Sequence, residues 1–213
     1  MQTVRLFFLS ALLTIGFAGL AQQADVIRNY IDTYRDIAIA EMQRTGVPAS
    51  IKLAQGIHET TAGTSDLVRK SNNHFGIKCK TSWTGEKVYH DDDARGECFR
   101  KYDAAEDSYK DHSDYLRSQP RYASLFALDP LDYKSWATGL KKAGYATNPK
   151  YAQILIKYIE KYNLGDYSLV ALGRKAPELY TIKAEQPKPS ADNRQKAMND
   201  ISISTQPKPV YPS

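Results

Sequence analysis

The carboxyl of Glu59 is the group in this sequence best placed to do chemistry. It lies in the segment Gln55–Ser65, where apolar residues at helical spacing precede it and a turn of small residues follows it. A carboxyl at the end of an apolar helix is expected to be partly desolvated, which raises its pKa and keeps it protonated near neutral pH. Such a group suits general acid catalysis, although a glutamate in the last turn of a helix is more often a solvated surface residue.

Other kinds of site do not fit the spacing. The pair His58-Glu59 begins a zinc-protease pattern, but Ala62 stands where that pattern needs its second histidine. Residues 91–96 begin like a calcium loop, but Arg95 and Tyr102 occupy positions that need oxygen ligands. The histidines have no metal-ligand spacing, and neither a serine-nucleophile motif nor a phosphate loop occurs. We therefore expect a site without a metal or another cofactor.

A helix must position Glu59, and the chain from Gln22 to Leu164 is predicted to be mostly helical. Asp103 and Glu106 predict a capping box at the start of one helix, and Asp132 is expected to cap the next. The helical period disappears between residues 72 and 102. The expected helices are 26–45, 48–59, 103–117, 132–143 and 148–162, and the expected short strands are 75–79, 87–89 and 98–102.

The first 21 residues have the pattern of a secretory signal peptide. Arg5 precedes an apolar run of about 16 residues that ends in the small-residue segment Gly19–Ala21. This run is short for a membrane span, so an uncleaved anchor is the weaker alternative, and no later segment could span a bilayer. We expect export to the periplasm or the extracellular space.

The composition predicts one folded domain and a tail. With 42% hydrophobic and 25% charged residues, the chain is typical of a globular protein, and residues 22–165 are assigned to its domain. In residues 166–213 a short apolar patch gives way to Pro-Lys-Pro repeats, so we expect a largely disordered tail. Positive and negative charges are mixed along the chain, which argues against nucleic acid as a partner.

The expected export bears on the oxidation state of the two cysteines. Cys79 and Cys98 would reach an oxidising compartment, where a disulfide between them is the expected state. A catalytic cysteine is the alternative, but neither thiol stands in a nucleophile motif. The disulfide would tie the first predicted strand to the last.

Six segments in order resemble the bacterial N-acetylglucosaminidases of glycoside hydrolase family 73, which are mannosyl-glycoprotein endo-β-N-acetylglucosaminidase-like peptidoglycan hydrolases. These segments are Gly46–Ser65, Ser71–Lys78, Trp83–Gly85, Phe99–Tyr102, Arg121–Tyr122 and Gly144–Tyr151, within roughly residues 35–164. The resemblance implies an α+β, mainly α fold: a lysozyme-like helical domain with a small β-hairpin lobe over the substrate groove. It also implies hydrolysis of the β-1,4 bond between N-acetylglucosamine and N-acetylmuramic acid in peptidoglycan strands.

The resemblance places Glu59 on the general acid of the family, which protonates the leaving oxygen. The family takes its second carboxylate from the β-lobe, usually as a glutamate, whereas the count here leads to Asp93. Glu97 ranks second and Asp92 third, and a purely solvated acidic turn is the alternative. Inverting, retaining and substrate-assisted mechanisms therefore all stay open.

Further residues match the family pattern beside the groove, where aromatic faces and amides suit sugars. The residues predicted to bind substrate are Asn73, Phe75, Gly76, Lys78, Tyr122, Tyr145, Thr147, Asn148 and Tyr151.

Two other functions stay open. The same fold with an impaired acid pair would bind peptidoglycan without cutting it, and a lytic transglycosylase would also use a single glutamate. We expect a monomer, associated with the cell wall.

Overall fold

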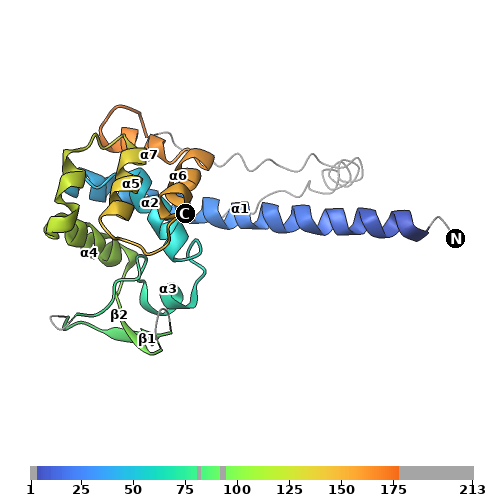
Figure 1. The fold of residues 1–213 in the computed structure, drawn as a ribbon, viewed down its shortest axis with the longest axis horizontal. Coiled ribbons are helices and arrows are strands. Elements are labelled where there is room, and N and C mark those ends of the chain that lie inside the picture. The colour runs from blue at the N-terminus through green and yellow to red at the C-terminus, as the bar shows by residue number, and fades with distance from the viewer. Residues whose placement is uncertain (1–3, 81–82, 92–94, 178–213) are drawn as a thin grey trace, which may run out of the picture. The chain divides into compact units, whose positions relative to one another are not determined.

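The computed structural model describes residues 4–80, 83–91 and 95–177, with side chains described from Gln22 onward. Asp92, Asp93 and residues 178–213, which make up most of the predicted tail, lie outside the described residues. The elements are α1 (Val4–Thr45), α2 (Ala49–Glu59), α3 (Asp66–Ser71), β1 (Lys87–His90), β2 (Glu97–Arg100), α4 (Ala105–Ser118), the 3-10 helix η1 (Pro120–Ala127), α5 (Tyr133–Lys142), α6 (Tyr151–Lys161) and α7 (Gly165–Ala171) (Figure 1).

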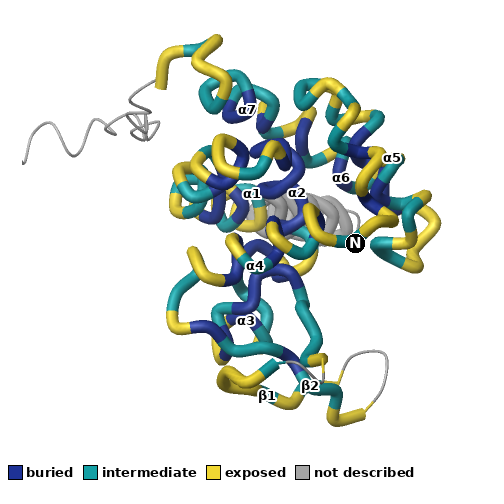
Figure 2. The backbone as a smooth tube through the Cα atoms, turned by 90° about the vertical axis from the view of Figure 1, so that its left-hand side faces the viewer, coloured by how far each residue is buried: buried dark blue, intermediate teal, exposed yellow. Residues whose placement is uncertain are grey.

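Helix α2 is the centre of the core. Every residue from Ala49 to Ile57 is buried, and the helix packs against α1, α5, α6 and α7 (Figure 2). Small residues permit this close packing: a Cβ on Gly56 would lie 2.2 Å from the hydroxyl oxygen of Tyr30 on α1. The predicted helix over 48–59 is confirmed, and Glu59 is its last residue.

Helix α1 is longer than predicted. The apolar periodicity predicts a helix from residue 26, whereas α1 starts at Val4 and continues unbroken to Thr45. No proline interrupts the earlier part, and its leucine and alanine residues favour a helix. Cleavage of a signal peptide after residue 21 stays a prediction. Within the part of the chain that the structure describes, no helix has the length and hydropathy needed to span a bilayer.

We call the region over residues 72–102 the β-lobe, and its described residues contain one antiparallel strand pair, β1 with β2. Lys87 faces Arg100, and His90 faces Glu97 in its register. The predicted disulfide between Cys79 and Cys98 is present, and it fastens the segment before the hairpin to β2. The β-lobe lies with α3 at one end of the helical region (Figure 1).

The predicted strand over 75–79 is wrong, because only Lys78 forms an isolated bridge, to Phe99. The side chain of Asn73 explains the difference. Its Oδ1 accepts from the backbone N–H of Ile77 at 3.0 Å, and its Nδ2 donates to the Ile77 carbonyl at 3.0 Å. Gly76 adopts a φ of +59°, which favours glycine, so residues 73–77 form a turn.

Two helix starts test the capping predictions. The Asp132 side chain accepts from the backbone N–H of Ser135 at 3.0 Å, as predicted. Helix α4 begins at Ala105, so its N-cap is Ala104, one residue after the predicted Asp103. The side chain of Ala104 cannot cap the helix, and no side-chain cap is present. The capping role of Asp103 is therefore wrong.

The folded unit continues past residue 165, where the sequence places the start of the tail. Helix α7 packs against α1 and α2, and its Tyr167 and Ser168 are buried. The Ser168 hydroxyl accepts from the backbone N–H of Ser50 at 3.1 Å. The short apolar patch after Leu164 therefore belongs to the core, because α2 offers it a partner.

We predict that replacing both Cys79 and Cys98 by serine lowers the free energy of unfolding by about 3 kcal/mol, the chain-entropy value for a loop of this size. Urea unfolding with circular dichroism measures this, with the reduced wild-type protein as control. Equal midpoints for the variant and the oxidised wild-type protein would contradict the prediction.

A buried aromatic cluster joins α1, α4 and the start of the β-lobe. The Tyr30 hydroxyl lies 2.8 Å from Nδ1 of His74 and 3.0 Å from the Tyr109 hydroxyl. Burial, with a smaller effect from the charge of Lys52, lowers the pKa of His74 to about 4. His74 is therefore neutral in the folded protein and binds a proton more readily when the chain unfolds.

This difference predicts that stability falls with acid. Because the unfolded state takes up the His74 proton first, about 3 kcal/mol of stability should be lost as the pH falls from about 6.5 to about 4. Urea unfolding across that range measures the loss, and His74→Gln should make the curve shallower there, with the contribution of the buried His112 remaining. An unchanged pH dependence in that variant would contradict the assignment to His74.

Candidate active site

A groove of about 410 Å³ opens at the end of α2, and we call it the Glu59 groove. Its walls come from the turn before the hairpin, from β2, from α4 and η1, and from the loop between α5 and α6. The residues that line it are Glu59, Phe75, Gly76, Ile77, Lys78, Lys80, Arg100, His112, Tyr115, Arg121, Tyr122, Tyr145, Ala146 and Thr147. A larger hollow of about 610 Å³, between the β-lobe and α4, does not include Glu59.

The turn after α2 directs Glu59 into the groove. The Thr60 hydroxyl donates to the Gly56 carbonyl at 2.6 Å, and the backbone of residues 61–63 has positive φ angles. The chain therefore turns away sharply while the carboxyl stays at the helix end. Glu59 itself is exposed. The expected partial desolvation of its carboxyl and the raised pKa stay predictions. The helix is buried only as far as Ile57.

The Glu59 carboxyl accepts a hydrogen bond from Tyr151. The Tyr151 hydroxyl donates to Oε1 of Glu59 at 3.1 Å, since a carboxylate only accepts. The same hydroxyl accepts from the side-chain amide of Gln55 at 3.0 Å. Burial and the charge of Glu59 raise the pKa of Tyr151 well above its usual value, so the tyrosine keeps its proton.

Tyr145 lies beside this pair. Its ring stacks on the Tyr151 ring, with centroids 5.6 Å apart, and its hydroxyl lies 2.9 Å from Nε2 of His112. Burial raises the pKa of Tyr145, and the neighbouring Tyr151 and Glu59 add to the effect.

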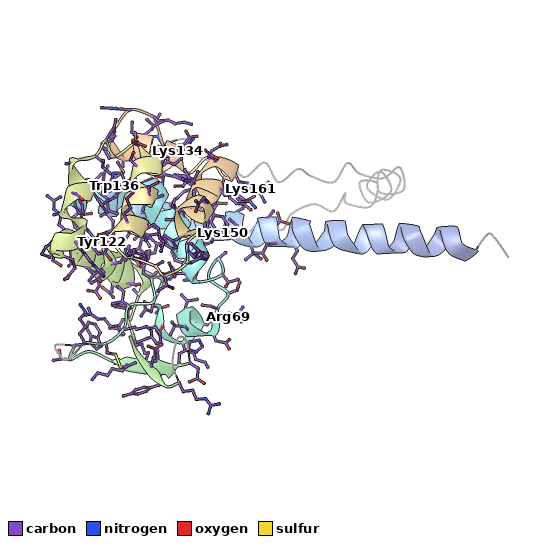
Figure 3. All side chains as sticks on the ribbon, in the orientation of Figure 1. Arg69, Tyr122, Lys134, Trp136, Lys150 and Lys161 are labelled. Carbon is purple, nitrogen blue, oxygen red and sulfur yellow. A yellow bond between two sulfur atoms is a disulfide. The ribbon has the colours of Figure 1, made fainter. Side chains whose placement is uncertain are left out.

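The predicted substrate-binding residues fall into two groups. Three of them do not line the groove: Asn73 is buried and shapes the turn described above, Asn148 accepts from the backbone N–H of Lys150 before α6, and Tyr151 contacts Glu59 from beneath. Those that line the groove are Phe75, Gly76, Lys78, Tyr122 (labelled in Figure 3), Tyr145 and Thr147.

Only one candidate for the second carboxylate is described. Glu97 lies on β2, and its carboxylate accepts from Lys78 Nζ at 2.7 Å. Asp93 and Asp92 lie outside the described residues. Among the described residues that line the groove, Glu59 is the only carboxylate.

Several groove residues were not predicted, and three of them are the cations Lys80, Arg100 and Arg121. Arg100 pairs with Asp111 at 2.7 Å, whereas Lys80 and Arg121 have no carboxylate partner among the described residues. The Arg121 guanidinium lies 4.7 Å from the centre of the Tyr122 ring. The segment Arg121–Tyr122 was part of the family resemblance, but no signal in the sequence identified Lys80.

Comparisons with known proteins identify the family of the chain. The family model for Glucosaminidase, described as mannosyl-glycoprotein endo-beta-N-acetylglucosaminidase, matches residues 35–164. The exo-glucosaminidase LytG of Bacillus subtilis is 30% identical over 190 residues, covering 81% of this chain and 67% of LytG. The peptidoglycan hydrolase FlgJ of Vibrio parahaemolyticus is 32% identical over 148 residues, covering 64% of this chain and about half of FlgJ (48%).

Solved structures share the fold. A peptidoglycan hydrolase from Sphingomonas sp. A1 superimposes with a TM-score of 0.58 at 33% identity, covering 67% of this chain and 94% of that one. The glycoside hydrolase domain of Salmonella typhimurium FlgJ gives 0.57 at 25% identity, covering 69% and 94%. The expected lysozyme-like, mainly helical fold with a small β-lobe is confirmed. With the family model matched over most of the folded unit and Glu59 at the groove, the chain belongs to the glucosaminidases of glycoside hydrolase family 73 and is a glycoside hydrolase.

Proposed function

We propose that this protein is an exported peptidoglycan hydrolase that cleaves the β-1,4 bond between N-acetylglucosamine and N-acetylmuramic acid, with Glu59 as the general acid. One observation carries the proposal: Glu59 is the only carboxylate among the described residues of the groove, and a buried tyrosine orients it. The relatives named as peptidoglycan hydrolases support the choice of substrate.

The contacts of Glu59 define where its proton would sit. Tyr151 donates to Oε1, so the proton of the neutral acid belongs on Oε2. Exposure does not prevent this role, because a bound glycan excludes water from the groove and desolvates the carboxyl. The acid then protonates the glycosidic oxygen as the bond breaks.

The second carboxylate is proposed in the order Asp93, Glu97 and Asp92. Glu97 pairs with Lys78 at 2.7 Å, and this ion pair suits an electrostatic role better than activation of water. Asp93 stays first, because the count along the family pattern leads to it.

The charge of the groove favours an anionic glycan. Lys80 and Arg121 have no carboxylate partner among the described residues, so their charges are available to a ligand. The lactyl ether of muramic acid carries carboxylates through its peptide stem, which these cations would attract. We propose the groove-lining residues Phe75, Tyr122 and Thr147 as sugar contacts.

The disulfide supports the proposed location. Disulfides persist in oxidising compartments and are rare in the cytosol, and the bond between Cys79 and Cys98 fastens the β-lobe. Together with the predicted signal over residues 1–21, this favours the periplasm or the extracellular space, in association with the cell wall.

The first experiment is digestion of purified peptidoglycan, with mass spectrometry of the fragments before and after borohydride reduction. We expect reducible N-acetylglucosamine ends, and at least a thousandfold less product with Glu59→Gln, because the amide cannot donate the acid proton. Glu106→Gln, on the exposed first turn of α4, is the matched control and should leave the rate unchanged.

Other results would overturn the proposal. Ends in the 1,6-anhydro form would identify a lytic transglycosylase. Intact glycan that the protein nevertheless retains would identify a binding protein on the same fold.

The second experiment tests how Glu59 is oriented. Tyr151→Phe removes the hydrogen bond to the carboxyl and leaves the Gln55 amide without its partner, so we expect kcat to fall about tenfold to a hundredfold. Tyr158→Phe, a half-buried tyrosine on the same helix, is the control and should keep its activity. An unchanged kcat in Tyr151→Phe would exclude an orienting role.

A further inference from the structure

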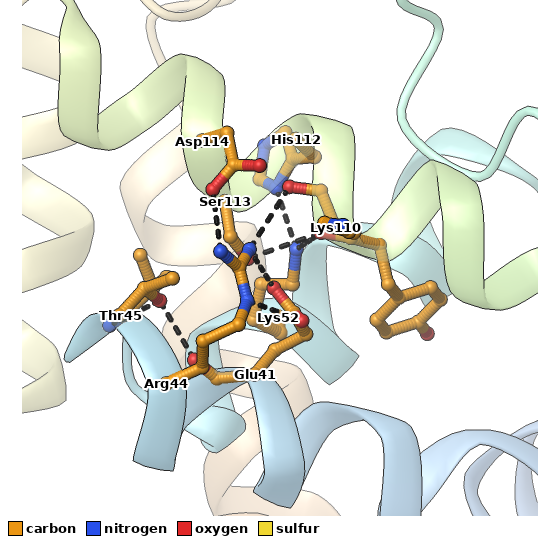
Figure 4. A network of polar contacts seen from close by, with 10 residues as sticks. Glu41, Arg44, Thr45, Lys52, Lys110, His112, Ser113 and Asp114 are labelled. Atoms are coloured by element: carbon orange, nitrogen blue, oxygen red, sulfur yellow. Dashed lines mark hydrogen bonds and ion pairs between the residues drawn. The ribbon is translucent and has the colours of Figure 1, made fainter.

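A fully buried lysine lies behind the Glu59 groove. Lys52 stands in the middle of α2, and its Nζ donates to the Tyr109 carbonyl at 2.7 Å (Figure 4). The same nitrogen lies 3.0 Å from Nδ1 of His112. No role in the proposed reaction accounts for a lysine at this depth, and a buried ammonium is costly without compensation.

The surroundings of Lys52 suit an ammonium. Its Nζ lies 4.3 Å from the centre of the Phe75 ring and 5.0 Å from the centre of the Tyr109 ring, so two π faces meet the charge. Burial lowers the pKa of Lys52 well below its usual value, and the negative charge of Glu41 opposes this. The carbonyl acceptor and the two ring faces favour the ammonium form, which we therefore assign to Lys52. An ammonium has three protons and no lone pair, so it can only donate to Nδ1 of His112.

His112 then has one possible neutral tautomer. The ring is buried, and burial together with the charge of Lys52 lowers its pKa well below the usual value, so the imidazole is neutral. Stacking on Phe75, with centroids 4.0 Å apart and planes 9° apart, fixes the ring plane. Because Nδ1 accepts from Lys52, the single proton lies on Nε2 and is donated to the Tyr145 hydroxyl oxygen at 2.9 Å.

This arrangement determines what Tyr145 can offer to a ligand. Its hydroxyl oxygen accepts from His112, which is its only hydrogen-bond partner among the described residues, so its own proton is left for another acceptor. Tyr145 lines the Glu59 groove and stacks on the tyrosine that holds Glu59. Its hydroxyl is therefore available as a donor next to the acid.

We propose that Lys52 and His112 are positioning residues that make Tyr145 a hydrogen-bond donor with a fixed direction, and that its acceptor is the N-acetyl carbonyl oxygen of the bound sugar. A sugar hydroxyl can rotate to meet either a donor or an acceptor, so it does not require a fixed donor. A carbonyl oxygen only accepts, which matches a donor held in place from behind. The inference rests on the proposed function for the nature of the glycan, whereas the state of His112 is independent of it.

The first test reads the imidazole directly. Two-bond ¹H–¹⁵N correlation spectra of the protein labelled with ¹⁵N-histidine distinguish the two neutral tautomers, and the spectrum of His112→Gln assigns the signal. We expect His112 protonated at Nε2 alone, and a change towards a mixture of tautomers in Lys52→Met. A wild-type His112 protonated at Nδ1 would overturn the proposal, even if the protein cuts peptidoglycan.

The second test separates positioning from a structural role. We expect His112→Phe to lower kcat in the wild-type protein and to cause no further loss in Tyr145→Phe, because it acts only through that hydroxyl. His112→Gln, whose amide can donate to Tyr145, should recover part of the rate. Equal losses in both backgrounds would mean that His112 merely supports the fold.

The third test identifies the acceptor. In the inactive Glu59→Gln protein, binding of N-acetylated and de-N-acetylated glycan fragments is measured by calorimetry. We expect Tyr145→Phe to weaken binding of the acetylated fragment about tenfold and to leave binding of the other unchanged. An equal loss for both fragments would exclude the N-acetyl carbonyl, and it would leave the hydrolase proposal intact if digestion succeeds.

Discussion

The burial of α2 on all sides is the constraint on which the rest of the structure depends. Every residue from Ala49 to Ile57 is buried, so the position of the helix is fixed by contacts from α1, α5, α6 and α7. A close-packed element of this kind cannot shift by small amounts. Glu59 inherits this rigidity at the helix end, while its carboxyl stays open to the groove. The acid is thus held on a rigid element without being enclosed.

The same helix carries polar groups through the core. Lys52 and Gln55 are both fully buried, and each reaches a tyrosine or histidine that belongs to the wall of the groove or lies just behind it. Buried polar groups of this type are costly unless they are hydrogen-bonded. Lys52 bonds to His112, whose Nε2 lies 2.9 Å from the Tyr145 hydroxyl, and Gln55 donates to the Tyr151 hydroxyl. Hydrogen bonds therefore link the buried helix to both tyrosines beside Glu59.

The sequence was informative where one local pattern decides the outcome. The periodic apolar residues identified α2 and α6, and the two cysteines, together with the expected export, identified the disulfide. The sequence was less informative where a contact with another segment decides the local structure. Asn73 converts a strand-like segment into a turn by binding the backbone of Ile77, and the residue type alone does not reveal which backbone it will choose.

The candidate site, like the fold, was predictable only where a local pattern decides. Glu59 could be found, because its place at a helix end is local, and the family resemblance gave it a role. Its exposure could not be predicted, because it depends on how the chain turns at Thr60 and on what stands opposite. Lys80 joins the groove from the segment just beyond the disulfide, far along the chain from Glu59, and nothing near it in the sequence marks it as a groove residue.

The distance along the chain between Glu59 and Tyr151 has a consequence for biosynthesis. The carboxyl leaves the ribosome 92 residues before the tyrosine that orients it, and α7, which closes over α2 through Ser168, comes later still. A nascent or C-terminally truncated chain therefore contains the acid but no assembled site. A chain that ends before α6 therefore lacks the hydrogen bond that orients this carboxyl, even though α2 is complete.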